Sequence, residues 1–443
     1  MTVTKTTRAV DQYLTRYAEP ESSSVPIDLS FDNVLVIPAF RESPESLAHC
    51  WRSLPERDRT LIIIVLNAPP GRQGETVSTL AGLSQRVMSR TGALVFCRTP
   101  DNRPLLLVDR CSNGQTIPVK HGVGLARKIG ADIALALWRD GKVRSPFIHS
   151  TDADTQLPVD YFTGAMDPDL LPNTSALVFP FLHQPSPGTE EVCYLYEISL
   201  HYYVAGLRWA GSPYAFHTIG STLAFRAQHY AEVRGFPRRS AGEDFYLLNK
   251  LAKRGPVVSL TRPVLNISGR VSDRVPVGTG PGIRKLQDLT SPRNDMRYYH
   301  PDCFIALREL LALLPIADEP GSHARGQFAG PIAGFLKQTR LLDGMPPAGP
   351  RRQRFLHDRF DGFQTLKFIH YIREHVAPSV TLSHALAAPF IEPLTGETPV
   401  SESTDGARPT TLDATPLADL RNLLAGADAR ADEVTSQALF RTR

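Results

Sequence analysis

The strongest constraint on the fold is a series of short, continuous apolar runs rich in β-branched residues. Residues 34–37 read Val-Leu-Val-Ile, residues 61–66 read Leu-Ile-Ile-Ile-Val-Leu, and Pro or Asn ends each run. A strand buried on both faces has this pattern, whereas a half-exposed strand alternates apolar and polar residues. Comparable runs follow at 93–97, 105–108, 146–149, 176–179 and 221–225. We therefore expect a mainly parallel sheet whose two faces are covered.

Segments with helical periodicity separate these runs. The clearest is 124–138, which places Leu125, Ile129 and Ile133 on one stripe. Further helices are expected at 43–54, 76–89, 189–208, 228–233 and 244–253. This alternation predicts an α/β domain with a mixed, mainly parallel sheet and helices on both faces. Ligands of such sheets bind beyond the carboxyl ends of the strands.

The chain of 443 residues is longer than one typical domain. Residues 1–30 are expected to form an N-terminal helix (8–17) and a linker (20–26), and 31–300 the α/β domain. Residues 301–390 are predicted to be a helical extension, with helices at 302–314 and 354–376 and a Pro/Gly-rich hinge or loop at 315–350. Residues 391–443 are polar and are expected to be a disordered, dispensable tail with one helix at 417–424.

Composition excludes several classes of protein. The net charge of +4 is too small for a nucleic-acid binder, and no apolar run approaches the ~20 residues of a membrane span. The polar N-terminus has no signal-peptide pattern, so we expect a cytoplasmic protein and leave open peripheral attachment to the inner membrane face. Five scattered cysteines without a CxxC pair predict buried free thiols.

An acidic motif follows the strand at 146–149. Asp152 and Asp154 are two residues apart, so in extended backbone both carboxylates project to the same side. Two carboxylates at one point suit Mg²⁺ or Mn²⁺, which commonly bridges protein carboxylates and substrate phosphates. An acidic turn after a strand is also common, so this motif alone is weak evidence.

Two further motifs strengthen the interpretation. Lys120, Gly122, Gly124 and Arg127 open a helix, where cations and free N–H groups would suit a diphosphate. The bland alternative is a basic first turn, although cations there oppose the helix dipole. The third glycine of a dinucleotide fingerprint is absent, and the chain has no GxxxxGK[ST] phosphate loop.

The last motif is an acidic pair at another helix start. Glu243 and Asp244 follow Gly242 and precede the helical segment ending near Lys253. Acidic residues in a first turn often serve only to stabilise the helix, so this motif alone supports a cap and a functional site about equally.

Taken together, residues 33–255 resemble the family-2 glycosyltransferases of the GT-A fold. The resemblance rests on five segments in order: 34–38 with Glu42, 124–130, 152–154, 220–226 with 235–236, and 242–244. It implies donor-binding roles for Pro38, Ala39, Glu42, Asn67, Lys120, Arg127 and Asp152. It also implies a metal site at Asp152 and Asp154 and a general base at Asp244, with Glu243 as a secondary candidate.

The sequence departs from that family in two places. Asn67 stands where the family usually has an aspartate that recognises the base, and no QxxRW follows Asp244, which disfavours a processive synthase. Arg270 and Arg274 instead lead into a glycine-rich loop at 278–282. These guanidiniums could bind the diphosphate or an anionic acceptor, and a solvated loop is the alternative.

The resemblance implies a metal-dependent, inverting, non-processive transfer from a nucleoside-diphosphate sugar to an acceptor hydroxyl. The acceptor could be a glycan, a lipid-linked molecule or a small molecule. One alternative is a retaining GT-A enzyme that makes a sugar–glycerate type of glycoside, with His217 or His300 as an extra metal ligand. A nucleotidyltransferase is disfavoured because its Gly- and Arg-rich signature is absent near 38–47. The last alternative is a non-catalytic protein that binds a sugar nucleotide or acts as a scaffold and offers helix 302–314 to a partner.

Overall fold

The computed structural model describes residues 5–55, 59–112, 114–163, 173–272, 274, 278–319, 321–322, 326–391 and 415–426. The chain divides into two compact units, residues 1–184 with 218–282 and residues 185–217 with 283–443. The boundary differs from the one expected at residue 300, because the aromatic helix that begins near residue 190 groups with the C-terminal helices.

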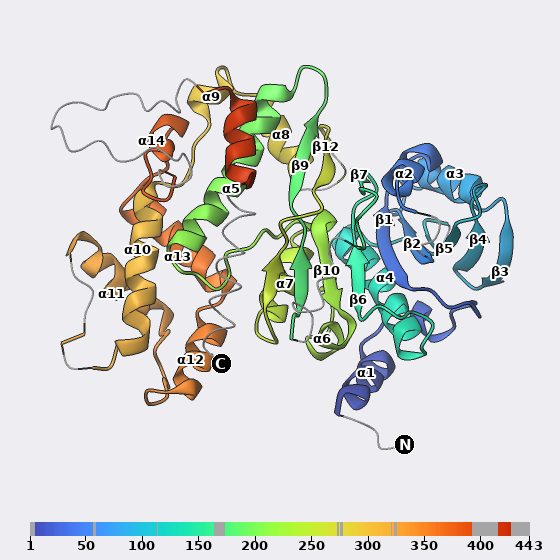
Figure 1. Ribbon diagram of the computed structural model, residues 1–443, viewed down its shortest axis with the longest axis horizontal. Coiled ribbons are helices and arrows are strands. Elements are labelled where there is room, and N and C mark those ends of the chain that lie inside the picture. Colours follow the sequence, from blue (N-terminus) through green and yellow to red (C-terminus); the bar gives the residue numbers. More distant parts are fainter. Residues whose placement is uncertain are drawn as a thin grey trace. The chain divides into compact units, whose positions relative to one another are not determined.

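The described residues of the first unit form a nine-stranded mixed sheet (Figure 1). The strand order is β11-β8-β10-β6-β1-β2-β5-β4-β3. The central strands β6, β1, β2 and β5 are parallel, and antiparallel pairs flank them on both sides. The bounds are β1 Asn33–Ala39, β2 Thr60–Asn67, β3 Val87–Thr91, β4 Leu94–Arg98, β5 Pro104–Arg110, β6 Phe147–Ser150, β8 Ala176–Val178, β10 Leu223–Arg226 and β11 Val257–Ser259. The expected α/β architecture with a mixed sheet is confirmed.

The apolar runs form the centre of this sheet. Every residue of β2 is buried, as is every residue of β1 except Asn33. Ala39 pairs with Leu66, and Val36 pairs with Ser150, so β1, β2 and β6 end at the same edge. The segments that follow these strands therefore meet, as expected for the carboxyl edge of a parallel sheet.

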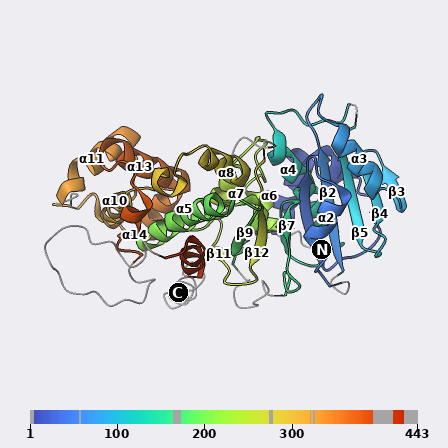
Figure 2. The same cartoon turned by 90° about the horizontal axis from the view of Figure 1, so that it is seen from above.

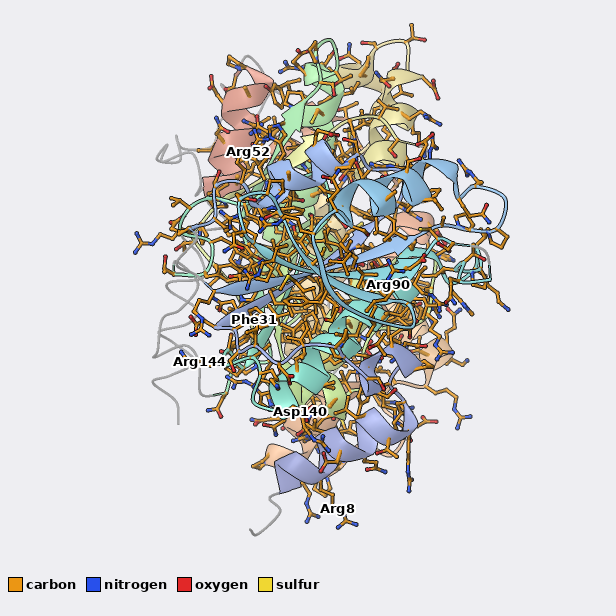
Figure 3. All side chains as sticks on the ribbon, turned by 90° about the vertical axis from the view of Figure 1, so that its right-hand side faces the viewer. Arg8, Phe31, Arg52, Arg90, Asp140 and Arg144 are labelled. Carbon is orange, nitrogen blue, oxygen red and sulfur yellow. The ribbon has the colours of Figure 1, made fainter. Side chains whose placement is uncertain are left out.

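Helices pack against this sheet. The bounds in the first unit are α1 Lys5–Arg16, η1 Pro20–Ser23, α2 Pro44–Trp51, α3 Gly74–Leu83, α4 Gly122–Arg139, η3 Gly220–Thr222, α6 Ala227–Glu232 and α7 Glu243–Leu251. Helix α4 packs along β1 and β2 and is buried over most of its length. Figure 3 shows Arg8, Arg52, Asp140 and Arg144 at the outside of the unit, while Phe31 is buried. Charged residues therefore cover an apolar core.

The N-terminal segment is part of the first unit and not a linker. Asp132 on α4 is fully buried and accepts hydrogen bonds from the Tyr13 hydroxyl at 2.6 Å and the Glu19 backbone N–H at 2.8 Å. Lys128 and the Tyr230 hydroxyl donate to the same carboxylate at 2.7 and 2.9 Å. A buried carboxylate needs such partners, so this network fixes α1 and η1 to the core and corrects the linker predicted at 20–26.

Short elements were harder to predict. The helix expected at 76–89 ends at Leu83, because β3 begins at Val87 and pairs with β4 (Figure 2). A separate three-stranded sheet has the order β7-β12-β9, with β7 Thr155–Gln156, β12 Leu265–Gly269 and β9 Phe181–Pro185. These strands are short and partly polar, so the apolar-run criterion missed them.

The second unit is helical among its described residues. The bounds are α5 Glu190–Trp209, α9 Pro292–Asp295, α10 Pro301–Leu313, α11 Ala329–Thr339, α12 Pro350–Arg359, α13 Gly362–His375 and α14 Leu382–Leu386, and α8 Thr279–Gln287 crosses the unit boundary. Helix α11 lies within the loop expected at 315–350, which corrects that prediction. Helix α10, suggested as a partner-binding helix, packs within the unit through Phe304, Leu307 and Leu310.

The predicted tail has one described segment. Residues 417–426 are helical, and Leu420 and Leu424 are buried. The Arg421 guanidinium lies 4.6 Å from the centre of the Tyr194 ring on α5. This helix therefore packs within the second unit, which corrects the disorder predicted for these residues. Residues 392–414 and 427–443 lie outside the described residues. Among the residues that the structure describes, no helix is long and apolar enough to cross a membrane.

Candidate active site

The candidate active site lies at the carboxyl edge of the parallel strands. Strand β1 leads into Glu42, and β6 leads into Asp152 and Asp154. The Thr151 backbone N–H donates to the Val36 carbonyl at 3.1 Å, which continues the pairing of β6 with β1 beyond the last residue of β6. The acidic motif is thus anchored to the centre of the sheet, as its position after a buried strand predicts.

Arg127 connects three of the predicted motifs. Its Nη2 donates to Asp152 Oδ1 at 2.6 Å, and its Nε donates to Glu243 Oε1 at 2.8 Å. Its Nη1 donates to Ser150 Oγ at 3.0 Å. Burial alone lowers the pKa of Arg127, but the charges of Asp152, Glu243 and Asp244 outweigh burial and raise it. Arg127 therefore stays charged and holds the acidic motif of β6 to the start of α7.

Gly220 makes room for this guanidinium. A Cβ atom at Gly220 would lie 2.7 Å from Arg127 Cζ, closer than real side chains allow. The Thr151 hydroxyl also donates to the Ser221 carbonyl at 2.8 Å, which fixes η3 beside the site. The glycine at the head of the 220–226 motif is therefore explained by contact with Arg127, a role that the sequence alone did not reveal.

A second ion cluster joins Glu42 to Asp154. Glu42 Oε1 accepts hydrogen bonds from Arg270 Nη2 and Arg274 Nη1. Arg270 Nη2 also lies 2.9 Å from Asp154 Oδ2, and Arg274 Nη2 lies 3.5 Å from the same oxygen. Arg270 is 228 residues distant from Glu42 in the sequence, yet both Arg270 and Arg274 lie at the acidic motif. A solvated loop is the weaker interpretation for these side chains.

The two acidic residues at the start of α7 have different surroundings. Glu243 is 3% exposed and is bound to Arg127, so it serves as the ion-pair partner of that guanidinium. Asp244 is partly exposed and accepts a 2.7 Å hydrogen bond from the Phe245 backbone N–H. Burial and the neighbouring charge of Glu243 raise the pKa of Asp244 to about 7, although Arg127 opposes this. A carboxylate with such a pKa can accept a proton near neutral pH.

The charges of the site test whether a divalent cation fits it. The carboxylates are Glu42, Asp152, Asp154, Glu243 and Asp244, and the guanidiniums are Arg127, Arg270 and Arg274. Two negative charges are therefore in excess when all of these groups are ionised. Burial and the charge of Asp152 also raise the pKa of Asp154, although Arg270 opposes this.

Hard oxygen donors with excess negative charge fit Mg²⁺ or Mn²⁺. The Asp152 side chain is 37% exposed and accessible to an ion. No group of three or more metal-ligating side chains occurs among the described residues. A metal here would therefore depend on Asp152, Asp154 and oxygens of a bound ligand.

The start of α4 differs from the expectation of free backbone N–H groups. The Gly124 N–H donates to the Arg239 carbonyl at 2.9 Å, and a Cβ at Gly122 would lie 2.9 Å from Ser240 Cα. These glycines therefore allow residues 237–240 to pack closely on α4. The Gly124 N–H is therefore not one of the free N–H groups expected at this helix start, because it already donates to a carbonyl. Lys120 is exposed just before α4.

The other predicted donor-binding residues lie at the ends of β1 and β2. Pro38 and Ala39 are the last residues of β1, and Asn67 is the last residue of β2. The Asn67 side-chain amide lies 3.3 Å from the Ala39 and Val65 carbonyl oxygens, which places its nitrogen toward them. Asn67 is therefore engaged with the backbone of the two strands.

Two histidines were suggested as extra metal ligands. His217 and His300 belong to the second unit. There, the His217 ring lies 5.0 Å from the His201 ring, and the His300 ring lies 4.8 Å from the His384 ring. Their use as metal ligands stays a prediction.

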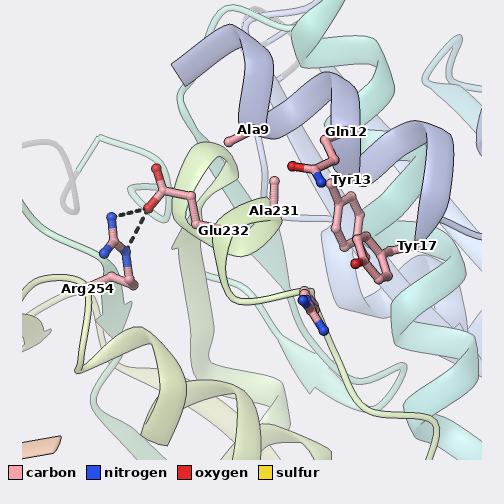
Figure 4. A pocket seen from close by; sticks show the side chains of 8 residues that line it. Ala9, Gln12, Tyr13, Tyr17, Ala231, Glu232 and Arg254 are labelled. Carbon is pink, nitrogen blue, oxygen red and sulfur yellow. Dashed lines mark hydrogen bonds and ion pairs between the residues drawn. The ribbon is translucent and has the colours of Figure 1, made fainter. Parts of the chain in front are cut away.

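A groove of about 370 Å³ lies elsewhere on the first unit, between α1 and α6 (Figure 4). Tyr13 and Tyr17 line one side, and Glu232 is paired with Arg254 on the other. Arg234 lies 4.7 Å from the centre of the Tyr17 ring. None of the predicted site residues lines this groove, so we do not assign the reaction to it.

Comparisons with known proteins give distant likenesses. No protein-family model matches the sequence, and no curated protein matches it. The chain is similar to TarS 1–349 of S. aureus in complex with UDP-GlcNAc, at 10% identity and a TM-score of 0.36, over 92% of each chain. It is also similar to GalNAc-T7 with UDP, GalNAc and Mn²⁺, at 12% identity and a TM-score of 0.36, over 80% of this chain and 59% of that one.

A third similar structure is the mannosyltransferase PcManGT from Pyrobaculum calidifontis in complex with GDP-Man and Mn²⁺. The identity is 14% and the TM-score 0.33, over 99% of this chain and 96% of that one. At these TM-scores the likenesses are too distant to assign residues or roles, so the site rests on its own geometry.

Proposed function

We propose that this protein is a glycosyltransferase of the GT-A type that moves a sugar from a nucleoside-diphosphate sugar to an acceptor hydroxyl. The proposal depends mainly on the two ion pairs of Arg127. This side chain binds both Asp152 and Glu243, and Asp244, the neighbour of Glu243, therefore lies at the same end of the sheet as the acidic motif. The reaction needs a base that accepts a proton near neutral pH and charged groups that stabilise the leaving diphosphate, and this site contains both.

Asp244 would act as the general base. In its ionised form it accepts the proton of the acceptor hydroxyl as that oxygen forms a bond to the anomeric carbon. The bond from the anomeric carbon to the diphosphate breaks, and the diphosphate leaves with the electron pair. A single displacement of this kind inverts the anomeric carbon, which is the outcome we propose.

The cations of the site would stabilise the leaving group. Arg270 and Arg274 provide guanidinium donors that suit phosphate oxygens, while Arg127 fixes the orientation of Asp152. When bound at Asp152 and Asp154, Mg²⁺ or Mn²⁺ would neutralise charge that develops on the diphosphate. Pro38, Ala39 and Asn67 at the strand ends, and Lys120 before α4, are proposed to contact the donor.

The state of the cysteines supports a cytoplasmic location as part of this proposal. All five cysteines are buried and unpaired, which suits a reducing compartment. The acceptor class stays open among glycans, lipid-linked molecules and small molecules.

Donor binding gives the first test. Thermal unfolding should be followed with UDP-, GDP- and dTDP-sugars, each with Mg²⁺, Mn²⁺ or EDTA. A ligand at about 100 times its Kd adds about 2.7 kcal/mol of stability, so the correct donor should shift the melting temperature clearly. Asp154→Ala should lose the shift and lower turnover by roughly 10²–10³-fold, the scale of removing one charge-stabilising group. Full activity of the wild-type protein in EDTA would overturn the metal site.

A further inference from the structure

Two arginines lie against the acidic motif. Arg270 Nη2 is 2.9 Å from Asp154 Oδ2, and Arg274 Nη2 is 3.5 Å from it. Oδ2 of Asp154, an oxygen that a divalent cation could use, therefore already has guanidinium partners. An ion and a guanidinium cannot both lie at hydrogen-bond distance from one oxygen along the same direction, so the two cations compete.

Glu42 provides an anchor that is separate from Asp154. Its side chain is 4% exposed and accepts from both guanidiniums. Arg274 also donates to the Phe40 carbonyl at 3.2 Å and to Ser272 Oγ at 3.0 Å. Both arginines can therefore leave Asp154 without leaving the end of β1.

Within the described part of the chain, one donor of the cluster has no acceptor. Arg270 Nε is buried and lacks a hydrogen-bond partner among the described residues. An unsatisfied donor on a charged group is costly, and a phosphate oxygen would satisfy it. The Arg270 guanidinium therefore keeps one donor that a bound anion could satisfy.

We infer that Arg270 and Arg274 change partners during donor binding: from Asp154 to the diphosphate as a divalent cation takes Asp154. The inference rests on the proposed function and adds a regulatory device to it. In the protein without donor, the arginines neutralise Asp154 and keep the metal out. The diphosphate attracts the arginines, and Asp154 then becomes free to bind the metal.

This exchange makes metal and diphosphate binding cooperative. Each ligand favours the arrangement in which the guanidiniums have left Asp154, so each raises the affinity for the other by the same factor. The metal alone should bind poorly because it must displace two guanidiniums. Donor-free protein would therefore hold little metal.

Removing the arginines should have opposite effects on the two ligands. Mn²⁺ binding to metal-free protein can be measured by electron paramagnetic resonance, without nucleotide. We expect R270A/R274A to bind Mn²⁺ about tenfold or more tightly than wild type, because Asp154 is unoccupied. Magnesium pyrophosphate, titrated calorimetrically in excess Mg²⁺, should bind that variant about tenfold or more weakly.

Arg72→Ala is the matched control. Arg72 is an exposed arginine near the same strand end, where its guanidinium lies 5.7 Å from the centre of the Phe40 ring. It should leave both affinities unchanged. If the double variant fails to fold, Arg270→Gln should show the same opposite shifts with smaller size.

The outcomes separate this inference from the proposed function. Mn²⁺ binding that is unchanged or weaker in the arginine variant would overturn the exchange of partners alone. Failure of Mn²⁺ to bind either protein would overturn the metal site and the inference with it. Tighter Mn²⁺ binding with weaker pyrophosphate binding supports the exchange, because a merely structural loss would weaken both.

Discussion

Glu243 and Asp244 are neighbours in the sequence, but their surroundings give them different chemistry. Successive side chains on a helix diverge by about 100°, so one of the pair can bind Arg127 while the other faces elsewhere. The sequence predicts this division, and the resemblance selects Asp244 as the base. The sequence does not predict that Glu243 binds Arg127, since the two residues are 116 positions apart.

The pH dependence of activity should follow Asp244. Only the ionised carboxylate accepts a proton, and its pKa is raised to about 7 by burial and the charge of Glu243. kcat/KM should therefore fall about tenfold per pH unit below that value. An ordinary aspartate would keep activity down to about pH 4. A profile that is flat between pH 8 and pH 5 would contradict the assignment.

The same pKa predicts a change of stability with pH. Because the folded protein holds this proton more tightly than the unfolded chain, the folded state loses stability as pH rises from about 4 through about 7. Asp244→Asn removes the unfavourable charge. It should therefore raise the melting temperature at pH 8 more than at pH 4.

Glu243→Gln tests the ion pair with Arg127. Both side chains are buried, with 4% of Glu243 and 3% of Arg127 exposed, so loss of the Glu243 charge leaves the buried guanidinium with Asp152 as its remaining ion-pair partner. We expect the free energy of unfolding to fall by about 1–3 kcal/mol, since glutamine retains one acceptor. Glu75→Gln is the control, because Glu75 is 66% exposed in its pair with Arg41 and should cost less than about 1 kcal/mol. Equal losses would show that Glu243 does not hold Arg127.

At the scale of elements, α4 positions the site because it packs closely on the sheet. A Cβ at Gly130 would overlap Val36 Cγ1 on β1 and lie 3.3 Å from Val65 Cγ2 on β2. Gly130→Ala should therefore destabilise the protein by about 1–3 kcal/mol through overpacking, measured by chemical denaturation.

Gly74→Ala is the control for that substitution. Gly74 begins α3, and a Cβ there would meet nothing within 4 Å. This variant should be neutral or slightly more stable. A similar effect of both substitutions would show that close packing of α4 is not the cause.

The long buried elements could be predicted from sequence, but the short ones could not. Strand β2 reads as a continuous apolar run, and α4 carries a clear helical stripe. Strand β3 has the sequence VMSRT with mostly exposed residues, so nothing separates it from the end of a helix. Strand β12 alternates buried and partly exposed residues over only five positions, and its partners are distant in sequence.

In the whole molecule, the helix at 417–426 is expected to stabilise the second unit. Leu420 and Leu424 are buried, and burial of each leucine contributes about 1.5–3 kcal/mol. Removal of residues 415–443 should therefore lower the melting temperature by several degrees, as followed by calorimetry. Removal of 427–443 is the control and should leave it unchanged. Equal melting temperatures for all three proteins would contradict the packing of the 417–426 helix.

The N-terminal residues are expected to contribute to stability, as the 417–426 helix does. Asp132 would lose its contacts with Tyr13 and Glu19 if α1 and η1 were removed. The whole chain is therefore the proper material for measurements of activity.

The central claim is transfer of a sugar from a nucleotide donor with Asp244 as the base. Its most direct test is release of nucleoside diphosphate, followed by mass spectrometry, from a panel of nucleotide sugars with Mn²⁺ and mixed acceptors. We predict release by the wild-type protein and a roughly 10²–10⁴-fold lower rate for Asp244→Asn, with donor affinity little changed. The anomeric configuration of the product, read by NMR, should be inverted. Equal release by Asp244→Asn, or a product with retained configuration, would contradict this account.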